Sequence, residues 1–109
     1  MPIREISVEE LTQAIDGDDP PVLLDVRTEA EHAIARLEPS TLLPLHELQG
    51  RLDEIAPWKD RPVVVYCHHG VRSKSGAAIL TAAGFADVVS LRGGIDAWST
   101  RIDPKVPRY

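Results

Sequence analysis

The only cysteine of the 109-residue chain lies in a segment that could support nucleophilic chemistry. Cys67 is followed by Gly70 and then by Arg72, at the end of a short loop. The amides of a tight loop that leads into a helix can point inward together, and such a nest at the positive end of a helix dipole favours thiolate over thiol. Gly70 lets the backbone curl around the sulfur, and Arg72 adds a fixed positive charge. Because the thiolate is the nucleophile, we predict a reactive Cys67 that can carry a persulfide or bind an oxyanion.

A buried, unreactive cysteine is the main alternative, because most isolated intracellular cysteines behave as small hydrophobic residues. Such a residue would not need Gly70 and Arg72 at these positions, nor a Ser73 that could cap the following helix. We therefore favour the reactive interpretation of Cys67.

Two histidines follow the cysteine directly, and all three are residue types that bind metal ions. Adjacent side chains seldom converge on one ion, so we predict no metal site at Cys67, His68 and His69, and no cofactor. We expect His68 and His69 to line the mouth of the pocket, where they present N–H groups or, at mildly acidic pH, positive charge. We interpret His32 and His46 as ordinary surface histidines.

The elements that position this loop alternate between apolar runs and helical patterns. The run at 63–66 is the most strand-like, and Cys67 follows it at the carboxyl end, where ligands bind in open α/β sheets. We expect further strands at 22–26, 41–44 and 87–91, and helices at 7–15, 29–34, 45–55, 73–83 and from a turn at 92–94 through Trp98. Ser7 and Glu10 have the spacing of a capping box. The alternation predicts an α/β fold with a largely parallel sheet and right-handed crossovers.

Length and composition indicate a single domain over residues 1–109. The net charge of -5 opposes general binding to nucleic acid or to an anionic membrane, because both need a broad basic field. One cysteine cannot form a disulfide within the chain, so the fold must rest on packing. No apolar run is long enough to span a bilayer, and residues 1–5 carry charges where a signal peptide needs apolar residues. We therefore expect a cytoplasmic protein.

Three segments of the chain resemble one family. The loop 67–73, Cys-His-His-Gly-Val-Arg-Ser, is similar to the Cys-x-x-Gly-x-Arg-Ser loop of rhodanese-like sulfurtransferases. Leu24–Arg27 followed by Glu31 resembles the family's early Asp-Val-Arg element, and residues 84–98 resemble its closing element. The similarity covers nearly the whole chain. It implies the rhodanese-like fold, with three α/β/α layers around a mainly parallel sheet of about five strands.

In this family a sulfur donor, commonly thiosulfate, passes its sulfane sulfur to the loop cysteine. The resulting persulfide then passes the sulfur to cyanide or to another thiophilic acceptor. The resemblance implies the same ping-pong reaction here, with Cys67 as the nucleophile and with Asp25 and Arg27 as structural support. The residues that would bind the substrate or hold the persulfide are His68, His69, Gly70, Val71, Arg72 and Ser73.

The segment 98–109 resembles the tail of rhodanese domains fused to adenylyltransferases that supply sulfur for molybdopterin or thiamine synthesis. There the acceptor is a small ubiquitin-like protein with an activated Gly-Gly end, so the resemblance implies a protein acceptor, and a cysteine desulfurase is an alternative partner. Two segments depart from the family pattern. Residues 38–40 replace a usual Gly-Ala, and His68 and His69 stand where many thiosulfate-specialised members have Lys or Arg. This second departure implies that thiosulfate is a poor donor.

Two other functions stay open for this fold. A cysteine-based phosphatase or arsenate reductase would use the same residue types around an oxyanion. Its loop, however, has five residues between cysteine and arginine, whereas four separate Cys67 from Arg72. A non-catalytic binding or regulatory module is the other alternative, and it is expected where the cysteine is missing.

Overall fold

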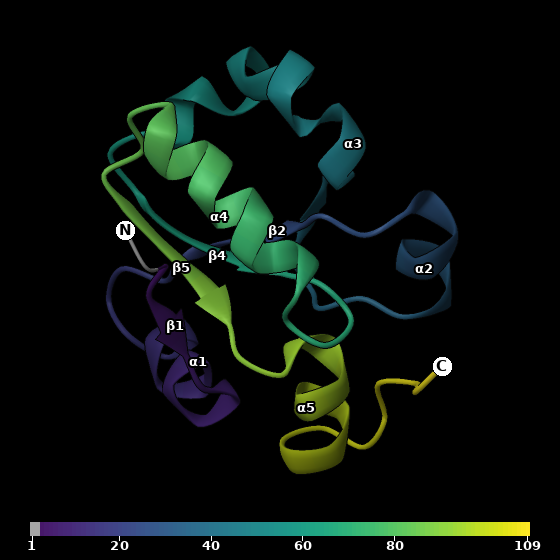
Figure 1. The fold of residues 1–109 in the computed structure, drawn as a ribbon. Helices are drawn as coiled ribbons and strands as arrows, with labels where there is room; N and C mark the ends of the chain where they lie inside the picture. The colour runs from purple at the N-terminus through teal and green to yellow at the C-terminus, as the bar shows by residue number, and fades with distance from the viewer. Residues whose placement is uncertain (1–2) are drawn as a thin grey trace.

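A five-stranded parallel sheet forms the centre of the computed structural model, which describes residues 3–109 (Figure 1). The strands lie in the order β1-β5-β4-β2-β3, and all neighbours pair in parallel. Their bounds are Glu5–Ile6 for β1, Val22–Asp25 for β2, Thr41–Leu42 for β3, Pro62–Tyr66 for β4 and Asp87–Leu91 for β5. The α/β fold with a parallel sheet is therefore confirmed, and β4 holds the central position.

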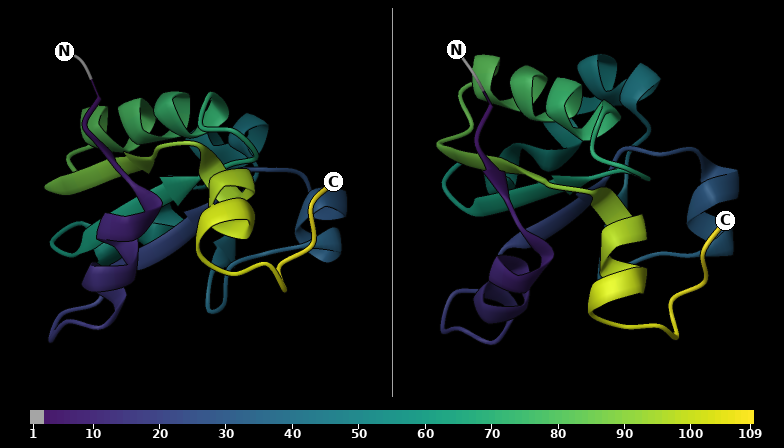
Figure 2. Two further views of the ribbon diagram at one scale, coloured as in Figure 1. Left: turned by 90° about the horizontal axis from the view of Figure 1, so that it is seen from below. Right: turned by 60° about the horizontal axis from the view of Figure 1, so that its bottom comes forward.

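Helices cover both faces of this sheet. They are α1 (Val8–Ile15), α2 (Glu29–Ile34), α3 (Leu45–Leu48), the 3-10 helix η1 (Gln49–Trp58), α4 (Arg72–Ala82) and α5 (Gly94–Arg101). Because side chains alternate along a strand, Val63 and Val65 of β4 pack with α3, η1 and α4, whereas Val64 and Tyr66 pack with α1 and α5. Figure 2 shows α4 and α1 on opposite sides of the sheet. The three α/β/α layers are confirmed.

Local signals explain one helix start and one wrong prediction. Ser7 Oγ accepts the amide of Glu10, and the Glu10 carboxylate accepts the amide of Ser7, so the predicted capping box is present. The regular helix predicted at 45–55 is instead a single turn, α3, followed by the 3-10 helix η1, with a non-helical Arg51 at φ -126°. Gly50, a poor helix former, precedes this kink. The apolar spacing alone therefore predicted a longer regular helix than the chain forms. Strand β1 was not predicted, because two residues carry no periodic signal.

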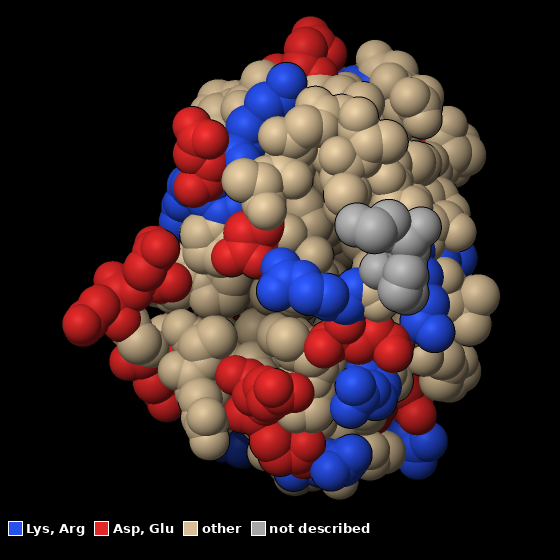
Figure 3. Space-filling model, turned by 60° about the vertical axis from the view of Figure 1, so that its left-hand side comes forward, with Lys and Arg blue, Asp and Glu red and all other residues tan. Residues whose placement is uncertain are grey.

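The surface and the termini bear on the predicted location and partners. No helix among residues 3–109 has both the length and the apolar character required to cross a bilayer. On the side of the molecule that Figure 3 presents, the described acidic and basic side chains are interspersed and form no broad basic field. The expected lack of a signal peptide depends in part on Met1 and Pro2, which lie outside the described residues.

Candidate active site

The sulfur of Cys67 lies beneath the loop that joins β4 to α4. The residue is 1% exposed and directly follows the last residue of β4. Two backbone amides donate to its Sγ atom, that of Gly70 at 3.1 Å and that of Ser73 at 3.3 Å. Gly70 has a φ of 99°, a conformation that glycine adopts without the steric cost of a Cβ. The loop thus presents two fixed N–H dipoles to the sulfur, which would stabilise negative charge there.

A pair of buried serines supports the sulfur from the side of β5. Ser73 Oγ lies 3.5 Å from Cys67 Sγ and 2.7 Å from Ser90 Oγ, and both serines are 0% exposed. Ser73 does not cap the helix as we expected, because Val71 occupies the N-cap position and Ser73 is the second residue of α4. Its hydroxyl therefore points to the sulfur and to the sheet. Ser90 was not predicted, although a serine within the apolar strand β5 was a detectable signal.

The predicted turn at 92–94 holds the loop from the other side. The amide of Ile95 donates to the carbonyl of Cys67 at 2.9 Å, and the amide of Asp96 donates to the carbonyl of His68 at 3.1 Å. Gly94 has a φ of 60°, and a Cβ at this position would collide with the carbonyl oxygens of Cys67 and His68. The sequence predicted this turn but not its role, which is to bring the start of α5 against the active-site backbone.

Asp25 and Arg27 form a buried ion pair at the carboxyl end of β2, the strand that lies next to β4. Arg27 Nε donates to Asp25 Oδ1 at 2.8 Å and its Nη2 donates to Oδ2 at 2.6 Å, with both side chains 0% exposed. Burial lowers the pKa of Arg27, but hydrogen bonds to Asp25 and Tyr109 outweigh it and raise that pKa. His32 is not the ordinary surface residue we expected, because its Nδ1 lies 2.8 Å from Asp25 Oδ2. His46 is exposed, as predicted.

Arg72, at the end of the loop, binds a carboxylate and not the sulfur. Its Nη1 and Nη2 donate to the two carboxylate oxygens of Glu31 at 2.6 and 2.9 Å. The hydrogen bond from Arg72 lowers the pKa of Glu31, and the same bond raises the pKa of Arg72. Glu31 is itself oriented by the first turn of α2, where it forms a capping box with Thr28. The positive charge expected beside Cys67 is therefore paired, and the N–H groups that donate to the sulfur belong to the backbone.

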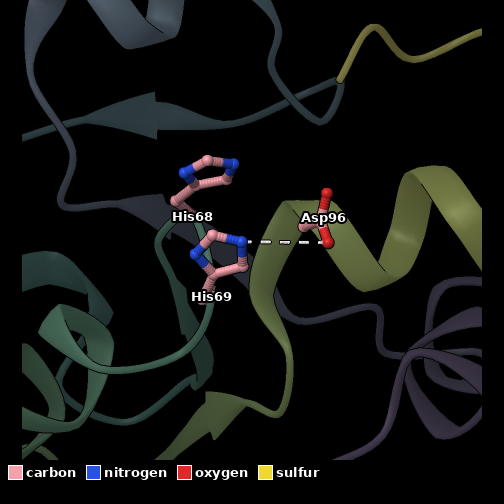
Figure 4. Close-up of side chains that lie close together, drawn as sticks. All are labelled: His68, His69 and Asp96. Atoms are coloured by element: carbon pink, nitrogen blue, oxygen red, sulfur yellow. Dashed lines mark ion pairs between the residues drawn. The ribbon is translucent and has the colours of Figure 1, made fainter. Parts of the chain in front are cut away.

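The two histidines and Val71 form the rim of the site. The ring of His68 stacks on that of His69, with centroids 3.9 Å apart, and also on that of Tyr109, at 4.0 Å. Burial is the main cause that lowers the pKa of His68, which favours the neutral form of its imidazole. His69 points toward Asp96 of α5, with Nε2 3.8 Å from Oδ2 (Figure 4). Val71 is 76% exposed, which places it at the surface next to the loop.

Three of these side chains are of a type and spacing that could hold a metal ion. One donor atom from each of His68, His69 and Asp96 lies within 4.8 Å of the others. The two imidazole rings are stacked with only 25° between their planes, so their in-plane lone pairs run side by side and do not converge. Arg108 Nε also donates to Asp96 Oδ1 at 2.9 Å. An ion would have to rotate a ring and displace Arg108, and the lack of a metal site stays a prediction.

The chain is similar in sequence and in fold to known proteins. A protein of Allochromatium vinosum named Sulfurtransferase is 40% identical over 97 residues, which cover 89% of this chain and 89% of that protein. The probable adenylyltransferase/sulfurtransferase MoeZ of Mycobacterium tuberculosis is 34% identical over 104 residues, which cover 95% of this chain but 26% of MoeZ. The crystal structure of a rhodanese-like domain protein from Staphylococcus aureus has a TM-score of 0.83 at 27% identity, over 98% of this chain and 99% of that one. Residues 7–101 match the family of the rhodanese-like domain, and the chain belongs to that family.

Proposed function

We propose that this chain is a sulfurtransferase that carries sulfane sulfur as a persulfide on Cys67. The observation that carries the proposal is the pair of amides, from Gly70 and Ser73, that donate to the sulfur of the only cysteine. Fixed dipoles at the place where negative charge develops stabilise both a thiolate and the terminal sulfur of a persulfide, without any cost of reorientation. A cysteine kept only for packing has no need of them.

The reaction has two steps that return the enzyme to its starting state. With thiosulfate as donor, the Cys67 thiolate attacks the sulfane sulfur, the S–S bond of thiosulfate breaks, and sulfite leaves with the bonding electron pair. Cyanide or a thiolate acceptor then attacks the terminal sulfur of the persulfide. With cyanide, thiocyanate forms and the Cys67 thiolate is released, so atoms and charges balance over the cycle.

The length of the loop favours sulfur over phosphate as the transferred group. The loop contains four residues between Cys67 and Arg72, which suits one sulfur better than a tetrahedral anion. Arg72 also gives two hydrogen bonds to Glu31, so its charge is already balanced before any anion binds. Hydrolysis of an aryl phosphate by the wild-type protein would instead support the phosphatase alternative.

The charge at the mouth favours a persulfide donor over thiosulfate. Thiosulfate is a dianion, and the rim offers it a His68 whose pKa is lowered by burial and an Arg72 whose charge is balanced by Glu31. A cysteine desulfurase delivers sulfur from a persulfide and needs no such cationic field. The names of the two relatives, a sulfurtransferase and an adenylyltransferase/sulfurtransferase, agree with sulfur transfer.

The test is to incubate the protein with a sulfur donor and measure its mass. We expect incubation with a cysteine desulfurase and cysteine to add the mass of one sulfur atom, and incubation with thiosulfate to do so more slowly. Cyanide or dithiothreitol should remove the added mass. Intact-protein mass spectrometry measures each step, and a wild-type protein that takes up no sulfur from either donor would refute the proposal.

A matched control separates the loop from the thiol itself. Cys67→Ser removes the only thiol and should take up no sulfur. The double variant Cys67→Ser/Ser75→Cys restores one thiol on the exposed side of α4, two residues beyond the loop. We expect the double variant to take up sulfur at least about tenfold more slowly than wild type, because its thiol lies away from the amide cradle formed by Gly70 and Ser73. Equal loading of the two proteins would show that any cysteine suffices.

A further inference from the structure

The segment after α5 returns to the active-site loop and places Tyr109 there. Figure 2 shows this segment running from α5 toward α2. The Tyr109 hydroxyl accepts a hydrogen bond from Arg27 Nη1 at 2.7 Å and donates one to Glu31 Oε2 at 2.8 Å. Its ring stacks on that of His68, with centroids 4.0 Å apart and 11° between the planes. One side chain therefore contacts the buried ion pair, the partner of Arg72 and the rim of the site.

The bond with Arg27 anchors this contact in the core of the domain. A guanidinium has five N–H donors. In Arg27 these face Asp25 twice, the carbonyls of Ala35 and Glu31 once each, and the hydroxyl of Tyr109. The Tyr109 hydroxyl is thus the fifth acceptor of a fully buried cation, and its loss would leave one donor without a protein partner.

We infer that Tyr109 is a positioning residue for the active-site loop, with one role for its ring and another for its hydroxyl. The ring fixes the imidazole of His68 at the mouth. The hydroxyl fixes the Glu31 carboxylate, which holds Arg72 at the start of α4, next to the Ser73 amide that donates to the sulfur. The inference rests on the proposed function for its effect on sulfur transfer, but the geometry of the resting protein can be tested separately.

The ring of His68 provides the first readout. Burial is the main cause that lowers its pKa. The charged groups that act on it are His69 in the loop, Asp96 of α5, Glu31 of α2 and Arg72 of α4. The Tyr109 hydroxyl contacts one of these groups, Glu31, which in turn holds Arg72. The effect of the ring on the exposure of His68 is therefore the difference between a variant that removes only the hydroxyl and one that removes the ring as well.

The experiment compares Tyr109→Phe with Tyr109→Leu by NMR titration of the histidines and by single-turnover sulfur transfer from loaded Cys67 to dithiothreitol. Tyr109→Phe keeps the stacked ring but removes the hydrogen bond to Glu31, so it should shift the pKa of His68 less than Tyr109→Leu does. Exchange of the Ser73 amide should become about threefold faster, and the rate of sulfur transfer should change by about threefold. Tyr109→Leu removes both the ring and the hydroxyl. It should raise the pKa of His68 toward its ordinary value, because the ring no longer covers the imidazole, and change transfer by about tenfold.

Lys105→Ala is the control, because it alters an exposed residue in the same segment and should leave both readouts unchanged. The inference fails if Tyr109→Leu titrates His68 as wild type does, or if Tyr109→Phe shifts that pKa as much as Tyr109→Leu. If Tyr109→Leu does not fold, Tyr109→Phe alone decides the role of the hydroxyl through the exchange rate of the Ser73 amide. Failure of the wild-type protein to load sulfur would refute the proposed function. The His68 titration would still test the positioning role of Tyr109, because it needs no sulfur transfer.

Discussion

The segments that follow β4 and β2 lie side by side at the same edge of the sheet, but they differ in how a charged group is stabilised. One uses backbone amides and the other uses a side chain of opposite charge. After β4, the Cys67 sulfur faces two amide dipoles and no cationic side chain donates to it among the described residues. After β2, the Arg27 cation is matched at once by the Asp25 carboxylate and all its donors have acceptors. The amides at the first site could stabilise additional negative charge on the sulfur, whereas the charge of Arg27 at the second site is already balanced. Glu31, Arg72 and Tyr109 join the two.

The largest effect on stability should come from the completed site. Asp25→Asn leaves the buried Arg27 guanidinium without its counterion. We therefore expect the free energy of unfolding, measured by urea denaturation, to fall by about 3–5 kcal/mol. The control is Asp87→Asn, which breaks the exposed pair with Arg4 and should change stability by about 0.5 kcal/mol or less. Similar losses in the two variants would mean that the Asp25 pair does not stabilise the domain in this way.

Gly94→Ala should have the next largest effect. Alanine at this position would have a strained φ, and its Cβ would collide with the carbonyl oxygens of Cys67 and His68. We therefore expect the free energy of unfolding to fall by about 2–4 kcal/mol and the loop to be displaced. Gly50→Ala is the matched control, because nothing lies within 4 Å of its Cβ position. Thermal unfolding of both variants measures the difference, and a Gly94→Ala protein as stable as Gly50→Ala would contradict the packing of α5 on the loop.

Removal of one hydroxyl beside the sulfur should have a smaller effect. Ser73→Ala keeps the amide that donates to Cys67 but leaves the buried Ser90 hydroxyl without this partner, at a cost of about 1 kcal/mol. Sulfur loading should slow but persist, because the two amides remain. The exposed neighbour offers a control, Ser75→Ala, which should leave stability and loading as in wild type. Complete loss of loading in Ser73→Ala would shift the proposed role from the amides to the hydroxyl.

The smallest effect concerns the link between the two sites and depends on pH. Arg72 lowers the pKa of Glu31 in the folded protein, so this carboxylate stabilises the fold fully above its unfolded pKa of about 4.3. The contribution falls as pH drops below that value toward the folded pKa. Urea midpoints from neutral to acidic pH should therefore fall less steeply for Glu31→Gln than for wild type, whereas Glu29→Gln, an exposed change on the same helix, should keep the wild-type slope.

Much of this protein follows from short stretches of sequence. The cradle around Cys67 is formed by seven consecutive residues, so local rules of loop and helix geometry sufficed to predict a reactive thiol. The apolar run at 63–66, with its three β-branched valines, likewise predicted a central strand, because such a run suits a strand that is covered on both faces. Local periodicity failed at 45–55, where the chain continues as a 3-10 helix.

The partners of the loop were decided by tertiary structure alone. Arg72 meets Glu31 across 41 positions, Ser73 meets Ser90 across 17, and Arg27 meets Tyr109 across 82. A single sequence contains no local signal for such pairs, since they depend on which strands and helices become neighbours after folding. The sequence by itself therefore determined that Cys67 has a cradle. The fold decided that Arg72 is bound to Glu31 and that Tyr109 reaches the rim, because only packing brings these distant side chains within hydrogen-bond distance.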